Sequence, residues 1–301
     1  MKENIDVYDA GQKAIIAWKD GDELLILSTD KYTSQKAKVL EFMPLPSKPD
    51  VVEKSSEEVF WQVAALIERH RPRVHGEDAV RRDVRTPPAK SSGPAAEPAV
   101  QVVFHEKIGA HDITIGQVKR MDGFTDWVKK FYTKNEMQYR EDDVKKLRPM
   151  VTDYLNRGYQ YFVFDIIELG TEKKSIEPIM YRFKSKNLYF PLAVTTLAEG
   201  ETTVALYLFT PGKTDIWGTK TGFVSGFYTL NGRVSYENPI KFPVNRNEVQ
   251  QISPILRDFL GAADRRWFST AKYQGPTKRL TRDFILRIAP EAAGIPSTVT
   301  F

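Results

Sequence analysis

The amino-acid sequence predicts an α+β protein with mainly antiparallel sheets, short helices between the strands and a helix near the C-terminus. Short runs of apolar, β-branched and aromatic residues recur along the chain, which is typical of strands. The dipeptides Asp20-Gly21 and Asn231-Gly232 separate two pairs of such runs and favour hairpin turns. Helical patterns cluster between the strands instead of alternating with them one by one, so a doubly wound parallel sheet is disfavoured.

The first section of the chain predicts three strands and a helix. Strands are expected at residues 13–19, 23–29 and 38–42. Three prolines from Pro44 to Pro49 fix φ and remove amide donors, so an extended exit from the sheet should follow. Ser55 and Glu58 then have the spacing of a capping box, ahead of an apolar helical face formed by Val59, Phe60, Val63, Ala64 and Ile67.

Residues 70–99 have a different composition, with proline, glycine, alanine and charged residues and no apolar periodicity. Such a segment buries too little apolar area to offset its ordering entropy. We expect a flexible loop here, either as an insertion or as a domain linker. The chain is thus divided into an α+β body at residues 1–252, interrupted by this loop, and a C-terminal helix with a basic tail at residues 253–301.

The rest of the body predicts more strands and a helical region that is kinked or divided. Asp122 can cap a short helix, and Pro149 disfavours one continuous helix after it. A last helix should begin at Ser253 and Pro254 and continue to about Trp267. The expected strands are 100–104, 112–118, 159–169, 179–184, 202–209, 223–230 and 233–236.

Composition excludes several kinds of chemistry. The 301 residues contain no cysteine, so disulfides, thiol nucleophiles and thiolate metal sites are absent. No apolar run reaches the roughly 18 residues of a membrane-spanning helix, and residues 1–10 contain no apolar core of a signal peptide. Gly212-Lys213-Thr214 lacks the first glycine of a phosphate-binding loop, because Tyr207 occupies that position.

Histidines and neighbouring acids give one candidate polar site, formed by His105, His111 and Asp112. A histidine beside a carboxylate can bind a metal or transfer a proton, although it is more often a surface pair. We therefore predict no catalytic residue, no metal site and no cofactor. A hydrolase or metal-dependent enzyme whose groups come from distant strands is the alternative.

The C-terminal segment holds the excess positive charge. Residues 257–287 contain eight basic and three acidic side chains, which equals the net charge of +5 of the whole chain. Aromatic residues lie between them, so an acidic protein, an acidic surface or nucleic acid is a candidate partner. The predicted contact residues are Arg265, Arg266, Lys272, Lys278, Arg279 and Arg282.

Several segments in a shared order resemble the domain of unknown function 2330 family. The resemblance is carried by Gly11 to Ile16, by Phe42 to Val51 with its Pro-x-Pro-Ser-x-Pro core, and by Gly109 to Ile113. It continues with Trp127-Val128 and ends with two further segments, Tyr159 to Ile166 and Leu188 to Leu192. These pieces lie between Gly11 and Pro211.

The resemblance implies an exported bacterial or archaeal protein without an established activity. The chain departs from the family in lacking a signal and the cysteines that many members carry after the first helix. We therefore expect a non-enzymatic surface or periplasmic module with a binding or structural role. The enzyme and the nucleic-acid-binding or acidic-partner-binding alternatives stay open.

Overall fold

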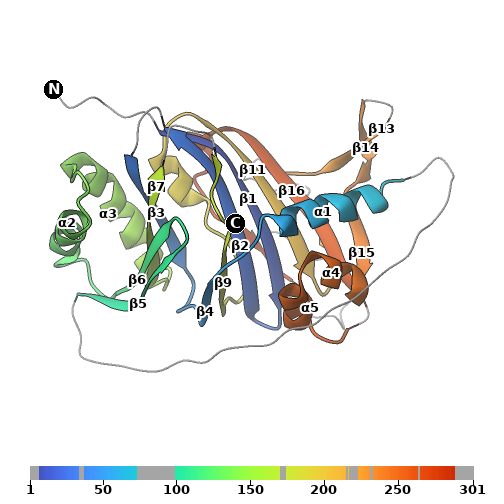
Figure 1. The fold of residues 1–301 in the computed structure, drawn as a ribbon, viewed down its shortest axis with the longest axis horizontal. Coiled ribbons are helices and arrows are strands. Elements are labelled where there is room, and N and C mark those ends of the chain that lie inside the picture. The colour runs from blue at the N-terminus through green and yellow to red at the C-terminus, as the bar shows by residue number, and fades with distance from the viewer. Residues whose placement is uncertain are drawn as a thin grey trace.

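The computed structural model describes residues 7–33, 37–72, 99–169, 174–214, 216, 223–230, 233–263 and 265–288. In these ranges two β-sheets lie face to face, and helices cover the outer face of each (Figure 1). The resulting layers are helix, sheet, sheet and helix. Most strand pairs are antiparallel, which confirms the α+β class. The predicted loop at residues 70–99 lies almost entirely outside the described residues.

The larger sheet has nine strands, ordered β12-β16-β11-β1-β2-β9-β4, with β15 paired to β16 and β8 to β2. The pair β1 and β11 is parallel. Asp20 and Gly21 join β1 to β2 with φ angles of 52° and 84°, which confirms the predicted hairpin. The strands are β1 Val7–Lys19, β2 Asp22–Thr33, β4 Val51–Lys54, β8 Lys174–Ser175, β9 Ile179–Lys184, β11 Glu201–Thr210, β12 Val224–Ser225, β15 Lys241–Asn245 and β16 Arg265–Pro276.

The smaller sheet has the order β3-β7-β6-β5. Pro44 lies near the end of edge strand β3, opposite Phe162, where a missing amide donor is tolerated. These strands are β3 Ala37–Leu45, β5 Val100–Ile108, β6 His111–Val118 and β7 Tyr161–Leu169. Two separate strand pairs complete the described β-structure: β10 Leu188–Phe190 with β17 Phe284–Leu286, and β13 Phe227–Leu230 with β14 Arg233–Pro239.

Helices cover the two outer faces. The larger sheet is covered by α1 Glu58–Arg69, α4 Arg246–Ile252 and α5 Pro254–Leu260, and the smaller sheet by α2 Phe124–Lys134 and α3 Glu141–Asn156 (Figure 1). Short 3-10 helices occupy Ala193–Leu197 and Thr277–Arg279. No helix in the described part of the chain is long and apolar enough to cross a membrane.

Three large apolar cores and one small cluster occur among the described residues, and the large ones separate the layers. They form on both sides of each sheet because neighbouring residues of a strand face opposite sides. On β1, Ile16 enters the core between the sheets and Ile15 enters the core beneath α1, α4 and α5. On β7, Val163 enters the core between the sheets and Phe164 packs under α2 and α3. Both sheets are therefore buried on both faces, which is why their central strands read as continuous apolar runs.

The predicted helix from Ser253 to about Trp267, followed by a basic tail, is wrong beyond α5. The helix ends at Leu260, where Gly261 has a φ of 77° and stops it. Arg265–Pro276 instead form β16, inside the larger sheet between β11 and β12. Phe268 enters the core beneath the helices and Tyr273 enters the core between the sheets, which is the alternation of a strand.

The sequence predicts a kinked or divided helix at Pro149, and the division is wrong, because Pro149 lies inside the single helix α3. A proline within a helix costs about 3 kcal/mol. Val144 and Leu147 are buried before it, and Val151 and Tyr154 after it. Burial of each such side chain contributes roughly 1.5–3 kcal/mol, so the apolar face offsets the lost hydrogen bond.

The helix starts differ from the predicted caps. Glu57 and Gly123 are the N-cap residues of α1 and α2, in place of the Ser55 and Asp122 that the sequence suggested. A capping box does occur at α4, where the Asn245 side chain accepts from the amides of Asn247 and Glu248. The carboxylate of Glu248 accepts from the amide of Asn245 in return.

Candidate functional site

Strand β6 carries His111 and Asp112 on opposite faces of the smaller sheet, as its two-residue period requires. His111 faces the larger sheet, on the same side as the buried Ile113. Asp112 faces α2, and its cross-strand neighbour on β5 is Lys107. The register of the β5–β6 hairpin also places His105 on the α2 side, opposite Thr114. The structure therefore brings His105 and Asp112 together and separates both from His111.

His111 forms a buried pair with Asp165 of β7. The Nδ1 atom of His111 lies 2.5 Å from Oδ2 of Asp165, and its Nε2 atom lies 2.8 Å from the backbone oxygen of Glu177. A carbonyl oxygen only accepts, so Nε2 donates to it, and a carboxylate accepts from Nδ1. Both ring nitrogens then carry a proton, so His111 is an imidazolium.

The electrostatics of this pair agree with that assignment. Burial favours the neutral imidazole, but the hydrogen bond and charge of Asp165, with smaller contributions from the Glu177 carbonyl and Glu41, raise the pKa of His111 overall. Glu41 in turn accepts from the hydroxyl of Thr29 at 3.0 Å. These groups come from both sheets, so the pair belongs to a polar cluster inside the core between them.

His111 ties three segments of the fold. Its two nitrogens connect β6 to β7 and to the residues just before β9. The Glu177 side chain forms an ion pair with Lys54 of β4, which fixes the same segment from outside. Both ring nitrogens of His111 therefore have protein partners, and the residue is buried.

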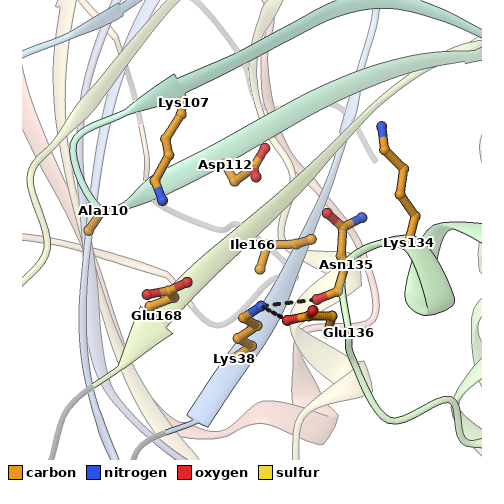
Figure 2. Close-up of a pocket in the computed structure, with 9 residues that line it drawn as sticks. All are labelled: Lys38, Lys107, Ala110, Asp112, Lys134, Asn135, Glu136, Ile166 and Glu168. Atoms are coloured by element: carbon orange, nitrogen blue, oxygen red, sulfur yellow. Dashed lines mark hydrogen bonds and ion pairs between the residues drawn. The ribbon is translucent and has the colours of Figure 1, made fainter.

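On the other face, the residues of the smaller sheet and the end of α2 enclose a recess of about 150 Å³. Figure 2 shows Asp112 and Ile166 in the middle of this recess, with the side chains of Lys107, Lys38 and Lys134 around them. The charged recess is lined by Lys38, Lys107, Ala110, Asp112, Lys134, Asn135, Glu136, Ile166 and Glu168. It therefore presents three lysines and three carboxylates.

Some of these charges are already paired. The ammonium group of Lys38 donates to the backbone oxygen of Asn135 at 3.1 Å and lies 3.6 Å from the Glu136 carboxylate. Asp112 lies 3.5 Å from Nδ1 of His105, which is also 3.0 Å from the Thr114 hydroxyl.

Lys107, Lys134 and Glu168 have no ion-pair partner within 4.0 Å among the described residues. The charged recess therefore offers charges of both signs that its own side chains leave uncompensated. No group of three or more His, Asp or Glu side chains that could hold a metal ion occurs in the part of the chain that the structure describes.

The lip of the charged recess has an unusual backbone. Helix α2 ends at Lys134, and Glu136 follows the C-cap residue Asn135 with a φ of 56°. Glycine is the common residue in this left-handed position, and a side chain there costs about 1–2 kcal/mol. The Asn135 amide donates to the backbone oxygen of Phe131 at 2.8 Å and holds this turn. The turn directs Glu136 back to Lys38.

Sequence reasoning found Asp112 and His105 and missed the other charged residues of this recess. Lys38, Lys134 and Glu168 lie far apart in the chain, on β3, α2 and β7, and only the strand register and the docking of α2 bring them together. Lys107 could have been found, since it faces Asp112 across the tight turn at Gly109 and Ala110.

The predicted basic contact residues do not gather around this recess. Arg265, Arg266 and Lys272 lie on β16, while Lys278, Arg279 and Arg282 follow it. Arg266 is buried and donates to the backbone oxygen of Leu260 at 2.7 Å. Arg265 is exposed at the first residue of the strand, and Lys272 is exposed in its second half. Whether these residues bind an acidic partner stays a prediction.

A family model described as "Uncharacterized protein conserved in bacteria (DUF2330)" matches residues 3–286. The chain therefore belongs to the DUF2330 family, and the match extends well beyond the segments that carry the resemblance in the sequence. The chain matches no curated protein.

Among solved structures, the fold is similar to baculovirus P35, with 10% identity, a TM-score of 0.46, and coverage of 80% of this chain and 74% of P35. A mutated baculovirus P35 after caspase cleavage gives 9% identity, a TM-score of 0.46, and coverage of 92% and 90%. The caspase-8/P35 complex gives 9% identity, a TM-score of 0.40, and coverage of 92% and 95%. A likeness at this level does not bear on function.

Proposed function

We propose that this member of the DUF2330 family is a non-enzymatic binding protein that acts at the cell surface or in the periplasm. The ligand is a small zwitterion, held in the charged recess. One observation carries this proposal: Lys107, Lys134 and Glu168 present charges of both signs in one recess, without counter-ions among the described residues. The surface or periplasmic location is what the family resemblance implies.

Charge complementarity favours a ligand with both signs. A simple anion would be attracted by the lysines and repelled by Asp112, Glu136 and Glu168, and a simple cation would meet the opposite pattern. Two unit charges at 4 Å interact by about 4 kcal/mol near a protein surface, so these terms largely cancel for a single charge. A zwitterion can place its carboxylate near Lys107 and Lys134 and its ammonium near Glu168.

The size of the charged recess limits the ligand. A volume of about 150 Å³ corresponds to roughly five waters at ~30 Å³ each. A molecule with about five to eight non-hydrogen atoms fits this space, which is the size of a simple amino acid. Ile166 supplies an apolar surface for its carbon chain.

The non-enzymatic assignment rests on how the histidines are used. His111, the candidate closest to a buried carboxylate, has both nitrogens engaged in holding the fold. His105 shares its Nδ1 atom between Thr114 and Asp112 at the edge of the hairpin. Binding requires only the fixed charges that the recess already displays.

Isothermal titration calorimetry with three molecules of similar shape tests the proposal. β-Alanine carries both charges, propionate only the negative one and propylamine only the positive one. We expect β-alanine to bind at least about tenfold more tightly than either of the others. Equal affinities for the three molecules, or no binding of β-alanine, would contradict the proposal.

Two substitutions locate the binding. Lys107→Gln and Glu168→Gln should each weaken β-alanine binding by about tenfold, because each removes one uncompensated charge. Lys130→Gln is the matched control, since Lys130 is an exposed lysine of α2 outside the recess. The control should leave the affinity unchanged.

A further inference from the structure

A second recess of about 370 Å³ lies away from the charged recess, where five segments of the chain meet. Its lining comes from the β1–β2 turn, the residues that follow β3, the connection from α3 to β7, the segment from the end of β9 into β10, and β17. This volume is within the range of about 300–1,000 Å³ that is typical of small-molecule sites. It exceeds the volume of the charged recess and takes a ring-sized ligand.

The lining of this second recess combines positive charge with apolar surface. Arg157, Lys184 and Lys186 are its charged residues, and the lining contains no Asp or Glu. Tyr159 and Ile285 supply aromatic and aliphatic surface. The charged recess, in contrast, mixes both signs, so the two recesses suit different ligands.

Two of the three cations have protein partners. Arg157 donates to Oδ2 of Asp283 at 2.6 Å, and Lys184 lies 2.7 Å from Asp22. Lys186 is exposed and has no ion-pair partner among the described residues. The second recess therefore keeps one uncompensated positive charge at its surface.

The aromatic wall is held rigidly. The guanidinium group of Arg157 lies 4.9 Å from the ring centre of Tyr159 and 4.7 Å from that of Tyr154, and the two rings stack at 6.0 Å. The ion pair with Asp283 fixes Arg157 from behind. Because these side chains are already ordered, ligand binding here costs little conformational entropy, which favours affinity.

A buried carboxyl group contacts the backbone of one lining residue of this recess. Glu23 is fully buried and accepts from the amide of Tyr189, a lining residue, at 2.7 Å. Burial raises the pKa of Glu23 well above its usual range, against the smaller effect of this hydrogen bond. A raised pKa favours the neutral form of this carboxyl group, which would not oppose the lysines of the recess.

We propose that the second recess binds a small anion carried on an aromatic ring, such as an aryl carboxylate. The anionic group lies against Lys186 and Arg157, and the ring packs on Tyr159 and Ile285. This binding is independent of the zwitterion site, because the two recesses share no lining residue.

Calorimetric titration with benzoate, phenyl phosphate, benzyl alcohol and acetate tests the proposal. Benzoate should bind at least about tenfold more tightly than benzyl alcohol, which lacks the charge, and than acetate, which lacks the ring. Phenyl phosphate shows whether the anionic group can be larger. A benzoate concentration of about 10 mM would detect even a site with a millimolar Kd. Absence of benzoate binding at that concentration, or equal binding of benzyl alcohol, would overturn the proposal.

Substitution of Lys186 locates the binding. Lys186→Gln should weaken benzoate binding about tenfold, while Lys48→Gln removes an equal charge from a nearby residue outside the lining and should have no effect. Lys107→Gln should also leave benzoate binding unchanged, which separates this proposal from the zwitterion site. Equal weakening by Lys186→Gln and Lys48→Gln would mean that only general surface charge attracts the anion.

Tryptophan fluorescence gives a second readout. The indole nitrogen of Trp18 donates to the backbone oxygen of Ser185, a lining residue, at 2.8 Å. Benzoate binding should change the emission of Trp18, and the change should be absent in Trp18→Phe. A benzoate-induced change that persists in Trp18→Phe would place the binding elsewhere and contradict the proposal.

Discussion

Two histidine–aspartate pairs lie on opposite faces of the smaller sheet and show how position decides the use of the same residue types. In the buried pair, His111 and Asp165 are 2.5 Å apart, with side chains only 5% and 4% exposed. In the open pair, His105 and Asp112 are 3.5 Å apart and 49% and 33% exposed. The buried pair holds the fold, whereas the open pair borders a recess where solvent and ligands can reach it.

The largest expected effect comes from removing one charge of the buried pair. Asp165→Asn leaves the His111 imidazolium without its counter-ion in the core, so the free energy of unfolding should fall by about 3–5 kcal/mol. Urea denaturation measures this change. Asp112→Asn is the matched substitution in the open pair and should cost less than about 1 kcal/mol. Similar losses of unfolding free energy in Asp165→Asn and Asp112→Asn would show that burial does not separate the two pairs.

A third carboxylate tests whether the number of donors matters as much as burial. Asp283 accepts from the Tyr154 hydroxyl, the Arg157 guanidinium, and the amides of Leu192 and Ala193. Asp283→Asn removes the charge that these donors stabilise and turns one oxygen into a donor, so we expect a loss of about 2–3 kcal/mol in urea denaturation. A loss below ~1 kcal/mol would show that the network adapts to an amide.

The pH dependence of stability tests the buried pair. The pKa of folded His111 is raised above its usual value of about 6.5, so its contribution is fully present below that pH. The contribution is lost as the pH rises through the pKa of the folded state. Urea denaturation at about pH 6 to 9 covers the range in which histidine titrates. The free energy of unfolding should decline over this range in the wild-type chain and not in His111→Gln. The same decline in both would assign it to another group.

The smallest expected effect concerns the open pair. His105→Gln should change the free energy of unfolding by less than about 0.5 kcal/mol, because exposed pairs contribute little. A loss near that of Asp165→Asn would mean that exposure does not separate the two pairs. Thermal denaturation is sufficient to detect such a difference.

The sequence predicted the fold class and many of the strands because these depend on local patterns. The Asp20-Gly21 hairpin and the apolar run of β7 are examples. It missed β16 because basic residues hide the alternation of Phe268, Ala271 and Tyr273. Asp165 did carry a signal, since a single aspartate with apolar residues on both sides in a strand indicates a buried partner.

The functional recesses depend on long-range arrangement and could not be predicted in the same way. The polar site expected from His105, His111 and Asp112 is divided between two faces, since adjacent residues of a strand point apart. Lys38 meets Glu136, and Arg157 meets Asp283, only after the sheets and helices have docked. Local sequence patterns do not predict which distant segments will line the same recess.

The parallel pairing of β1 with β11 has a consequence for how the chain acquires its structure. Gln12 lies opposite Val204, and β11 in turn pairs with β16, so the centre of the larger sheet joins the two ends of the described chain. Closing such a long loop costs conformational entropy before the contacts between the strands form and stabilise the sheet, and this slows folding. The residues of the β1–β2 hairpin are synthesised first, so the β1 edge has no partner strand until residues 201–210 have emerged from the ribosome.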